Sequence, residues 1–233
     1  MAIAFDAQSK SSIFTTGTSN SFAHTCTGTN LTLVVSISLN SGGNTVSGVT
    51  YNSVSMTQVQ TARYHQSTAA RMYTFILINP STGSNNIAIT TANSLTSNGD
   101  MQAGGNSYTG TLQSAQPDAS NLQESATSDS SITQNVTVVA SNCWGYGATF
   151  NVNATQSTNF YDPTGVLTTK RQAAGDDQII IADSNGTIGT GSRAMGFSQN
   201  GGTNSCTGLV VLSIAPFPSS NTAGALLMTS LVI

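Results

Sequence analysis

The sequence is poor in charged side chains. It has six Lys or Arg and nine Asp or Glu among 233 residues, and the ranges 11–62 and 194–233 contain none of them. An ordinary soluble domain is about one-quarter charged. Because the six basic residues are scattered and the net charge is only −3, a nucleic-acid-binding surface is excluded. Solubility must therefore come from hydroxyls and amides, since Ser and Thr together supply 67 residues.

The sequence also lacks the apolar segments that membrane insertion and secretion require. No apolar run approaches the roughly 20 residues that span a bilayer. The first ten residues show no basic stretch followed by an apolar one, so we expect no secretory signal. The composition is nevertheless typical of proteins that work outside a cell. Together these features favour a virion protein that is made in a host cytoplasm and released by lysis, and a secreted or cell-surface protein is the alternative.

Cysteines are too few to form a disulfide scaffold. There are three, and two of them have similar contexts, because Cys26 lies in Thr-Cys-Thr-Gly and Cys206 in Ser-Cys-Thr-Gly, each before an apolar strand. If those strands are neighbours, the two thiols could form a disulfide. The other interpretation is that they are separate buried thiols that pack as small apolar side chains.

Residues for acid–base or metal chemistry are scarce as well. His24 and Cys26 supply two possible ligands on one strand face, whereas a structural zinc site needs four. Glu124 is the only Glu, and a hydrolase needs a nucleophile with its base or a pair of carboxylates. The dipeptide Asp162-Pro163 is similar to part of the calcium loop of legume-type lectins, but the acidic partners of that loop are missing beside it. We therefore expect no catalytic residue, no metal and no cofactor.

Alternating hydrophobicity marks the clearest strands. In the range 31–39 the odd positions are apolar and the even positions are mostly Thr and Ser, which predicts a half-buried antiparallel strand. The range 71–78 is apolar on both faces and should be a central strand. In the range 144–150 the side chains of one face are large, and Gly145 and Gly147 on the other face would let another layer approach closely.

Ten or more short strands at a spacing of 8–12 residues predict an all-β fold, an antiparallel and jelly-roll-like β-sandwich. Chains of this length often form one large sandwich, so we expect a single domain over residues 1–218. The polar ranges 111–131 and 153–177 are expected to be long loops. The pair Gly104-Gly105 predicts a bulge or close backbone packing within the strand 101–109.

The segment 219–233 is unusual because its last eleven residues are apolar and uncharged. An exposed segment of this kind promotes aggregation, so it must pack on its own sheet or on a neighbouring subunit. We expect the large apolar side chains of this segment at subunit contacts; they are Leu226, Leu227, Met228, Leu231, Val232 and Ile233.

Several turn and strand motifs together resemble a known group of proteins. These motifs are Ala23-His-Thr-Cys-Thr-Gly-Thr-Asn30, Val46-Ser-Gly-Val-Thr-Tyr-Asn52, Asn79-Pro-Ser-Thr-Gly-Ser-Asn-Asn-Ile87, Gly104-Gly-Asn-Ser-Tyr-Thr-Gly110 and the closing strand Leu209–Ala215. Across residues 3–216 the chain resembles an uncharacterised family of Ser/Thr/Gly-rich β-sandwich proteins from bacteriophages and environmental bacterial sequences. The resemblance implies a fold like that of phage decoration, head-fibre and tail accessory proteins, and it brings no catalytic residues.

The sequence therefore predicts a non-enzymatic virion structural protein. We expect it to bind other copies of itself and other virion proteins as a capsid decoration or tail accessory protein. The alternatives are a glycan- or receptor-binding adhesin, or a pilus-like secreted subunit. Four aromatic residues could stack on a glycan, although most aromatic side chains of a sandwich belong to its core; they are Tyr64, Tyr108, Trp144 and Tyr161.

Overall fold

The computed structural model is entirely β in the residues it describes. These residues are 1–41, 43–63, 70–96, 100–124, 131–151, 158–161, 171–173, 179–199 and 206–218. Every regular element within them is a strand, and every pairing between strands is antiparallel. The predicted fold class, an antiparallel β-sandwich, is confirmed.

The described residues form seventeen strands. They are β1 (Ala4–Lys10), β2 (Gly17–Cys26), β3 (Thr32–Asn40), β4 (Val46–Tyr51), β5 (Val54–Ser55), β6 (Thr57–Arg63), β7 (Ala70–Ile78), β8 (Gly83–Leu95), β9 (Asp100–Thr109), β10 (Ala119–Gln123), β11 (Ser131–Val138), β12 (Cys143–Asn151), β13 (Thr158–Tyr161), β14 (Arg171–Ala173), β15 (Ile179–Ile188), β16 (Gly191–Gln199) and β17 (Cys206–Ile214).

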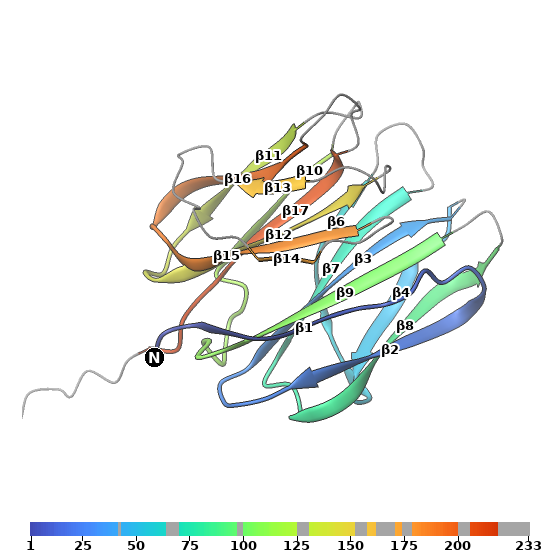
Figure 1. Cartoon of the computed structure of the whole chain (residues 1–233), viewed down its shortest axis with the longest axis horizontal. Coiled ribbons are helices and arrows are strands. Elements are labelled where there is room, and N and C mark those ends of the chain that lie inside the picture. The colour runs from blue at the N-terminus through green and yellow to red at the C-terminus, as the bar shows by residue number, and fades with distance from the viewer. Residues whose placement is uncertain are drawn as a thin grey trace, which may run out of the picture.

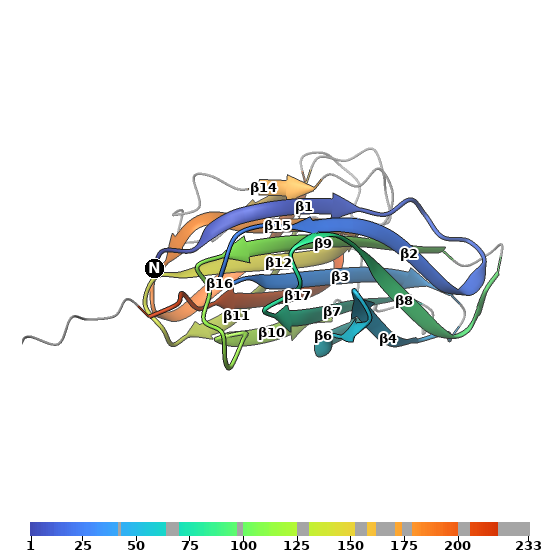
Figure 2. The ribbon, with the colours of Figure 1, turned by 90° about the horizontal axis from the view of Figure 1, so that it is seen from below.

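The strands form four sheets that stack as four layers (Figures 1 and 2). We number them in stacking order: sheet I is β2-β8-β4-β5, sheet II is β1-β9-β3-β7-β6, sheet III is β10-β17-β12-β15-β14, and sheet IV is β11-β16-β13. Sheets I and II form an N-terminal sandwich, and sheets III and IV form a C-terminal one. The two sandwiches pack against each other through sheets II and III and share a core there.

The two sandwiches have the same strand order. In chain order, each strand of sheets I and II except β5 has a counterpart in sheets III and IV, so that β1-β9-β3-β7-β6 corresponds to β10-β17-β12-β15-β14 and β2-β8-β4 corresponds to β11-β16-β13. The orders β1-β9-β3-β7 and β2-β8-β4 are those of a jelly roll. The match extends to single residues, because Asn30 before β3 and Asn142 before β12 both have a positive φ, of 51° and 60°. The fold is therefore an internally repeated jelly roll.

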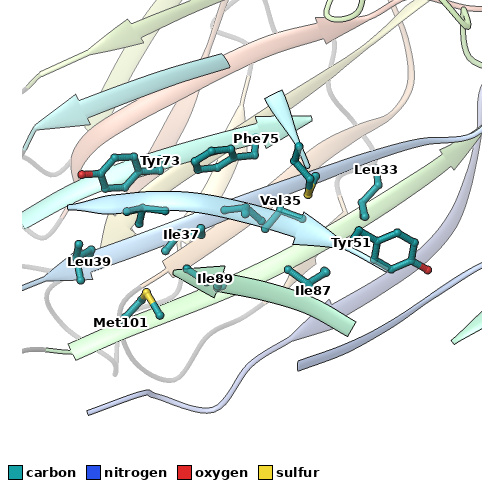
Figure 3. Packing of buried hydrophobic residues seen from close by; sticks show 14 of the residues in the cluster. Leu33, Val35, Ile37, Leu39, Tyr51, Tyr73, Phe75, Ile87, Ile89 and Met101 are labelled. Atoms are coloured by element: carbon teal, nitrogen blue, oxygen red, sulfur yellow. The ribbon is translucent and has the colours of Figure 1, made fainter. Parts of the chain in front are cut away.

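Three apolar cores separate the four layers. The core between sheets I and II is built by side chains of β3 on one side and of β4 and β8 on the other (Figure 3). Its largest contributors from these three strands are fully or nearly fully buried: Leu33, Val35, Ile37, Leu39, Val49, Tyr51, Ile87 and Ile89. A second core joins sheets II and III, and a third joins sheets III and IV. Burying an aliphatic side chain of this size stabilises the folded state by about 1.5–3 kcal/mol.

The second face of β3 is also buried, which corrects the expectation of a half-buried strand. Every residue from Thr32 to Leu39 is buried. Polar Ser36 faces sheet III, where its hydroxyl lies 2.7 Å from the hydroxyl of Tyr146 and 2.9 Å from that of Thr74. The predicted alternation with a period of two is present in β3. The face lined with Ser and Thr, however, is covered by the C-terminal sandwich, and its hydroxyl groups form hydrogen bonds there.

A second group of polar contacts crosses between sheets II and III. The Tyr108 hydroxyl donates to the carboxylate of fully buried Asp183 at 3.1 Å, and the Asn106 amide donates to the Tyr108 hydroxyl at 3.2 Å. The backbone nitrogen of Asn185 donates to the other carboxylate oxygen at 2.8 Å. These bonds fix how the two sandwiches sit on each other, because a displaced layer would leave buried polar groups unpaired.

Glycines allow close layers where the sequence predicted them. A methyl group added at Gly147 would lie 2.6 Å from Cε2 of Phe160 and 3.2 Å from Cε2 of Phe197, both of which come from sheet IV. At Gly105 an added methyl would lie 3.0 Å from Ile87 of sheet I. The strands β3 and β9 pair without a register shift there, so the pair at 104–105 serves close packing rather than a bulge.

The predicted long loops contain short strands. β10 lies within the range 111–131, and β13 and β14 lie within 153–177. Their few apolar residues give no pattern, and they are ordered by pairing with the long strands β17, β16 and β15. Strand β2 was also missed, because Ser, Asn and Thr occupy most of its positions.

Candidate interaction surface

The outward face of sheet I is coated with hydroxyl and amide groups. In β2 the residues alternate between exposed and buried, so that Ser21 and Thr25 face outward while His24 and Cys26 face the core. The same alternation in β8 exposes Asn86. Sheet I is an outer layer, and none of the other three sheets covers this face (Figure 1).

The strand register aligns these side chains in rows across the sheet. Ser21 of β2 pairs with Ala88 of β8, which pairs in turn with Thr50 of β4. In the next row Ala23 pairs with Asn86. The face is hollowed by a shallow depression of about 480 Å³ around these rows, and its lining consists of Ser, Thr, Asn and Ala; the residues are Ser19, Ser21, Thr50, Asn52, Ser53, Ser84, Asn85, Asn86 and Ala88.

Sheet I carries no formal charge. Its four strands contain no Asp, Glu, Lys or Arg, and their only titratable imidazole, His24, is buried. A soluble protein normally carries charged residues over about a quarter to a third of its surface. Such a face can be covered by another molecule without burying an unpaired charge, which would otherwise cost several kcal/mol. It is therefore suited to contact with another uncharged surface.

A hydrogen-bonded cluster fixes the edge where β1 meets β2. The Ser9 hydroxyl lies 2.7 Å from Nδ1 of His24, and the Ser107 hydroxyl lies 3.0 Å from Nε2. Ser107 donates to the carboxylate of Asp6 at 2.6 Å, and the backbone nitrogen of Thr27 donates to the same carboxylate at 3.0 and 3.2 Å. The cluster thus connects β1, β2 and β9 and links sheet I to sheet II.

Burial controls the protonation of this cluster. It lowers the pKa of His24 to about 4, and the negative charge of Asp6 opposes this effect only in part. The imidazole is therefore neutral at pH 7, with a hydroxyl at each ring nitrogen. A neutral imidazole beside a serine is a possible base, but here Ser107 stands between the ring and the carboxylate. What the observed contacts do is hold three strands together.

A second hollow lies at the end of the molecule where Met1 approaches Phe217. The backbone nitrogen of Met1 donates to the Phe217 carbonyl at 2.9 Å, and the first strand and the segment after β17 lie side by side there (Figures 1 and 2). We call this hollow the end pocket; it has a volume of about 610 Å³ and is lined by Met1, Ala2, Ile3, Ser141, Asn142, Trp144, Thr187, Pro216, Phe217 and Pro218. Its lining combines apolar side chains with three small polar ones, so it suits an apolar segment whose backbone needs hydrogen-bond partners.

The structure separates the two cysteines that were considered as a disulfide. Cys26 is a buried free thiol on sheet I, and burial raises the pKa of that thiol. Cys206 begins β17 of sheet III, and its side chain lies outside the described residues. Of the two interpretations, the structure thus has Cys26 as a separate thiol and does not form the disulfide with Cys206. Cys143 is likewise free and buried.

The aromatic residues considered for glycan stacking are not gathered at one place. Tyr108 is fully buried, and Trp144 is 8% exposed and reaches only the end pocket. Tyr64 and the side chain of Tyr161 lie outside the described residues, as do Asp162-Pro163 and the whole segment 219–233 with its six expected contact residues. The uncharged face of sheet I was not singled out from the sequence, because the strand β2 that completes it was not recognised.

Within the described ranges, no three His, Cys, Asp or Glu side chains come together as metal ligands do. The same part of the chain contains no helix with the length and hydropathy of a transmembrane span. No protein-family model matches the chain, and comparisons with curated proteins and with solved structures likewise give no significant match.

Proposed function

We propose that this protein is a non-enzymatic structural protein of a virion. It decorates a capsid or accompanies a tail, and it acts through contacts with other copies of itself and with other virion proteins. The observation that carries this proposal is the exposed face of sheet I, whose strands contain no formal charge. The cores of protein–protein interfaces are depleted in charged residues in the same way. The resemblance of its turn and strand motifs to those of phage β-sandwich proteins is what favours the virion as the place of assembly.

The four-layer build supports a structural role as well. The two jelly rolls are joined by a common apolar core and by buried hydrogen bonds, which oppose movement of one against the other. A rigid face binds with little loss of conformational freedom, which lowers the cost of association. The binding free energy would come from shape and from hydroxyl and amide contacts rather than from ion pairs.

The test adds charge to the centre of this face. The variant S21K/N86K places two lysines on exposed positions that line the depression of sheet I. We expect self-association measured by sedimentation velocity to weaken at least tenfold, about 1.4 kcal/mol, because lysine ammonium groups would be desolvated in the contact. The control S131K/V139K adds the same charge at exposed positions on and beside β11, and it should associate like the wild type.

A second readout places the protein in the particle. The chain should be present in purified virions, in hundreds of copies if it covers a capsid lattice and in a few copies if it belongs to a tail. The proposal fails if virions that carry the gene contain no copies of the chain, or if S21K/N86K associates as strongly as the wild type.

The depression on sheet I also favours a second function, the binding of cell-surface glycans. Its hydroxyl and amide lining could donate to and accept from sugar hydroxyls. In that case Thr50→Ala and Asn86→Ala would abolish binding on a glycan array and leave self-association unchanged. Loss of self-association without any glycan binding would favour the structural role.

A further inference from the structure

We propose that the end pocket binds the segment 223–233 of a second copy of this chain, and that two copies exchange these segments reciprocally. This inference deepens the proposed function, because it names the partner of a second surface. It rests on the lining of the pocket, on where the segment starts, and on the composition of the segment.

The pocket offers apolar walls and polar anchors. Ile3, Trp144 and Phe217 supply the walls, while Asn142 and Thr187 supply an amide and a hydroxyl. An extended peptide could bury its side chains against the walls and use the polar groups for its own backbone, as in strand-mediated peptide recognition. Asn142 is exposed and holds a positive φ of 60°, at the turn that leads into β12.

The segment begins at the rim of the pocket. Pro218, the last residue before it, is itself part of the lining. Residues 219–222 are Ser-Ser-Asn-Thr, a polar spacer that spans up to about 13 Å when extended. Residues 223–233 follow with no charge and with six large apolar side chains. A stretch of this kind needs a cover, since exposed uncharged apolar segments aggregate.

A second copy provides that cover better than the chain itself. Eleven extended residues reach about 36 Å, whereas the pocket of about 610 Å³ holds only a few side chains. Folding back onto its own pocket would shelter the first residues and leave the rest in water. In a two-fold pair each copy presents both a pocket and a segment at the same end, so the remaining residues run along the interface and are covered by both chains.

The test separates donor from acceptor within the full chain. The variant L226N/L227N has an intact pocket and a polar segment, and Ser141→Trp has an intact segment and a pocket filled by an indole. Both are made in the S21K/N86K background, which weakens the sheet I contact, and each alone should sediment as a monomer at concentrations where S21K/N86K sediments as a dimer. A mixture of the two should form heterodimers, because the intact pocket of L226N/L227N can still bind the intact segment of Ser141→Trp.

Controls keep this test decisive. Ser131→Trp in the same background puts the same side chain on an exposed position of β11 that does not line the pocket, and it should dimerise like S21K/N86K. Circular dichroism and the melting temperature show whether Ser141→Trp is folded, and Thr187→Trp fills the pocket from β15 if it is not. The inference is overturned if the mixture stays monomeric, or if either variant alone dimerises as S21K/N86K does.

This failure can be told apart from failure of the proposed function. S21K/N86K changes sheet I and leaves the pocket and the segment intact, so segment exchange should still produce its dimer. If L226N/L227N assembles normally while S21K/N86K does not, the exchange is wrong and the assembly role stands. If S21K/N86K assembles normally, the assembly role through sheet I is wrong whatever the segment does.

Discussion

The two sandwiches share a strand order but differ in what the middle strand of the inner sheet contributes to the core. In the N-terminal sandwich the inner strand β3 supplies the bulk, with Val35 facing sheet I. At the matching position of the C-terminal sandwich the inner strand has Gly147, and the bulk comes from Phe160 and Phe197 of the outer sheet. The same topology can therefore carry its large side chains on either of two packed sheets, provided that together they fill the space between the layers.

The outer sheets differ in charge as well. Sheet I has no charged residue, whereas sheet IV carries Arg193, whose side chain donates to the carbonyls of Gly189 at 2.9 Å and Thr190 at 3.0 Å. The repeated fold thus offers two related outer sheets, of which sheet I has no charged residue in its strands. This difference is the reason to assign the assembly contact to sheet I.

The largest effect on stability is expected at the matching positions Val35 and Gly147, where one sandwich has a large side chain and the other has none. Val35→Gly removes a buried side chain and loosens the strand, and should cost about 3–4 kcal/mol of unfolding free energy. Gly147→Val should cost about 2–3 kcal/mol, because the added methyl groups meet Phe160 and Phe197. Both changes make the two sandwiches more alike at this position, yet both should lower the unfolding free energy measured by urea titration. Gly48→Val is the control, because nothing lies within 4 Å of a side chain added there, and it should change stability by less than about 0.5 kcal/mol.

A comparable effect is expected from acid at the edge of the N-terminal sandwich. The pKa of His24 is lowered to about 4 in the folded protein, against 6.5 for an exposed histidine. Between pH 4 and pH 6.5 the unfolded chain binds a proton at this residue that the folded chain does not bind. The contribution of His24 to the unfolding free energy is therefore fully present above pH 6.5 and is lost as the pH drops toward 4. The contribution of this residue is about 3 kcal/mol.

The variant His24→Gln checks this pH dependence. Its unfolding free energy should fall by about 3 kcal/mol less than that of the wild type when urea titrations at pH 7 and pH 4 are compared. The carboxylates titrate in both proteins, so the difference reports on His24. Parallel curves for the two proteins would show that burial does not hold this imidazole neutral.

Smaller effects are expected at the junction of sheets II and III. Tyr108→Phe removes a donor from buried Asp183 and should cost about 2 kcal/mol. Tyr146→Phe should cost about 1 kcal/mol, because Ser36 keeps its bond to Thr74. If both variants were as stable as the wild type, these bonds would not fix the two sandwiches on each other.

The smallest effect on folding is expected on the face of sheet I. Ser21→Ala and Thr90→Ala change exposed side chains and should alter the unfolding free energy by less than about 0.5 kcal/mol each. Thermal melts check this expectation. A large loss of stability in either variant would mean that these hydroxyls serve the fold rather than a contact.

The fold was predictable wherever apolar residues follow a period. Strands β3 and β12 have such a pattern, β7 is a continuous apolar run, and the spacing of glycines in β12 predicted the close approach of another layer. The second sandwich was not predictable, because Ser36 looks like a solvent-facing residue until Tyr146, more than one hundred positions away, covers it. Sequence patterns report local burial, whereas this layer is created by a distant part of the chain.

The candidate surface was predictable only in its chemistry. The shortage of charged residues indicated a surface of hydroxyls and amides. The sheet with this surface includes β2, however, and β2 has too few apolar residues among its Ser, Asn and Thr to be recognised as a strand. The end pocket could not be found from the sequence at all, because it joins Met1, Trp144 and Phe217 from three separate segments.

Sedimentation velocity of the full chain, in parallel with S21K/N86K and S131K/V139K, tests the central claim most directly. We predict that the wild type and S131K/V139K form the same assemblies over the same concentration range, while S21K/N86K needs at least about tenfold more protein to form assemblies larger than the exchange dimer. Identical profiles for all three proteins would contradict the assignment of sheet I as the assembly face.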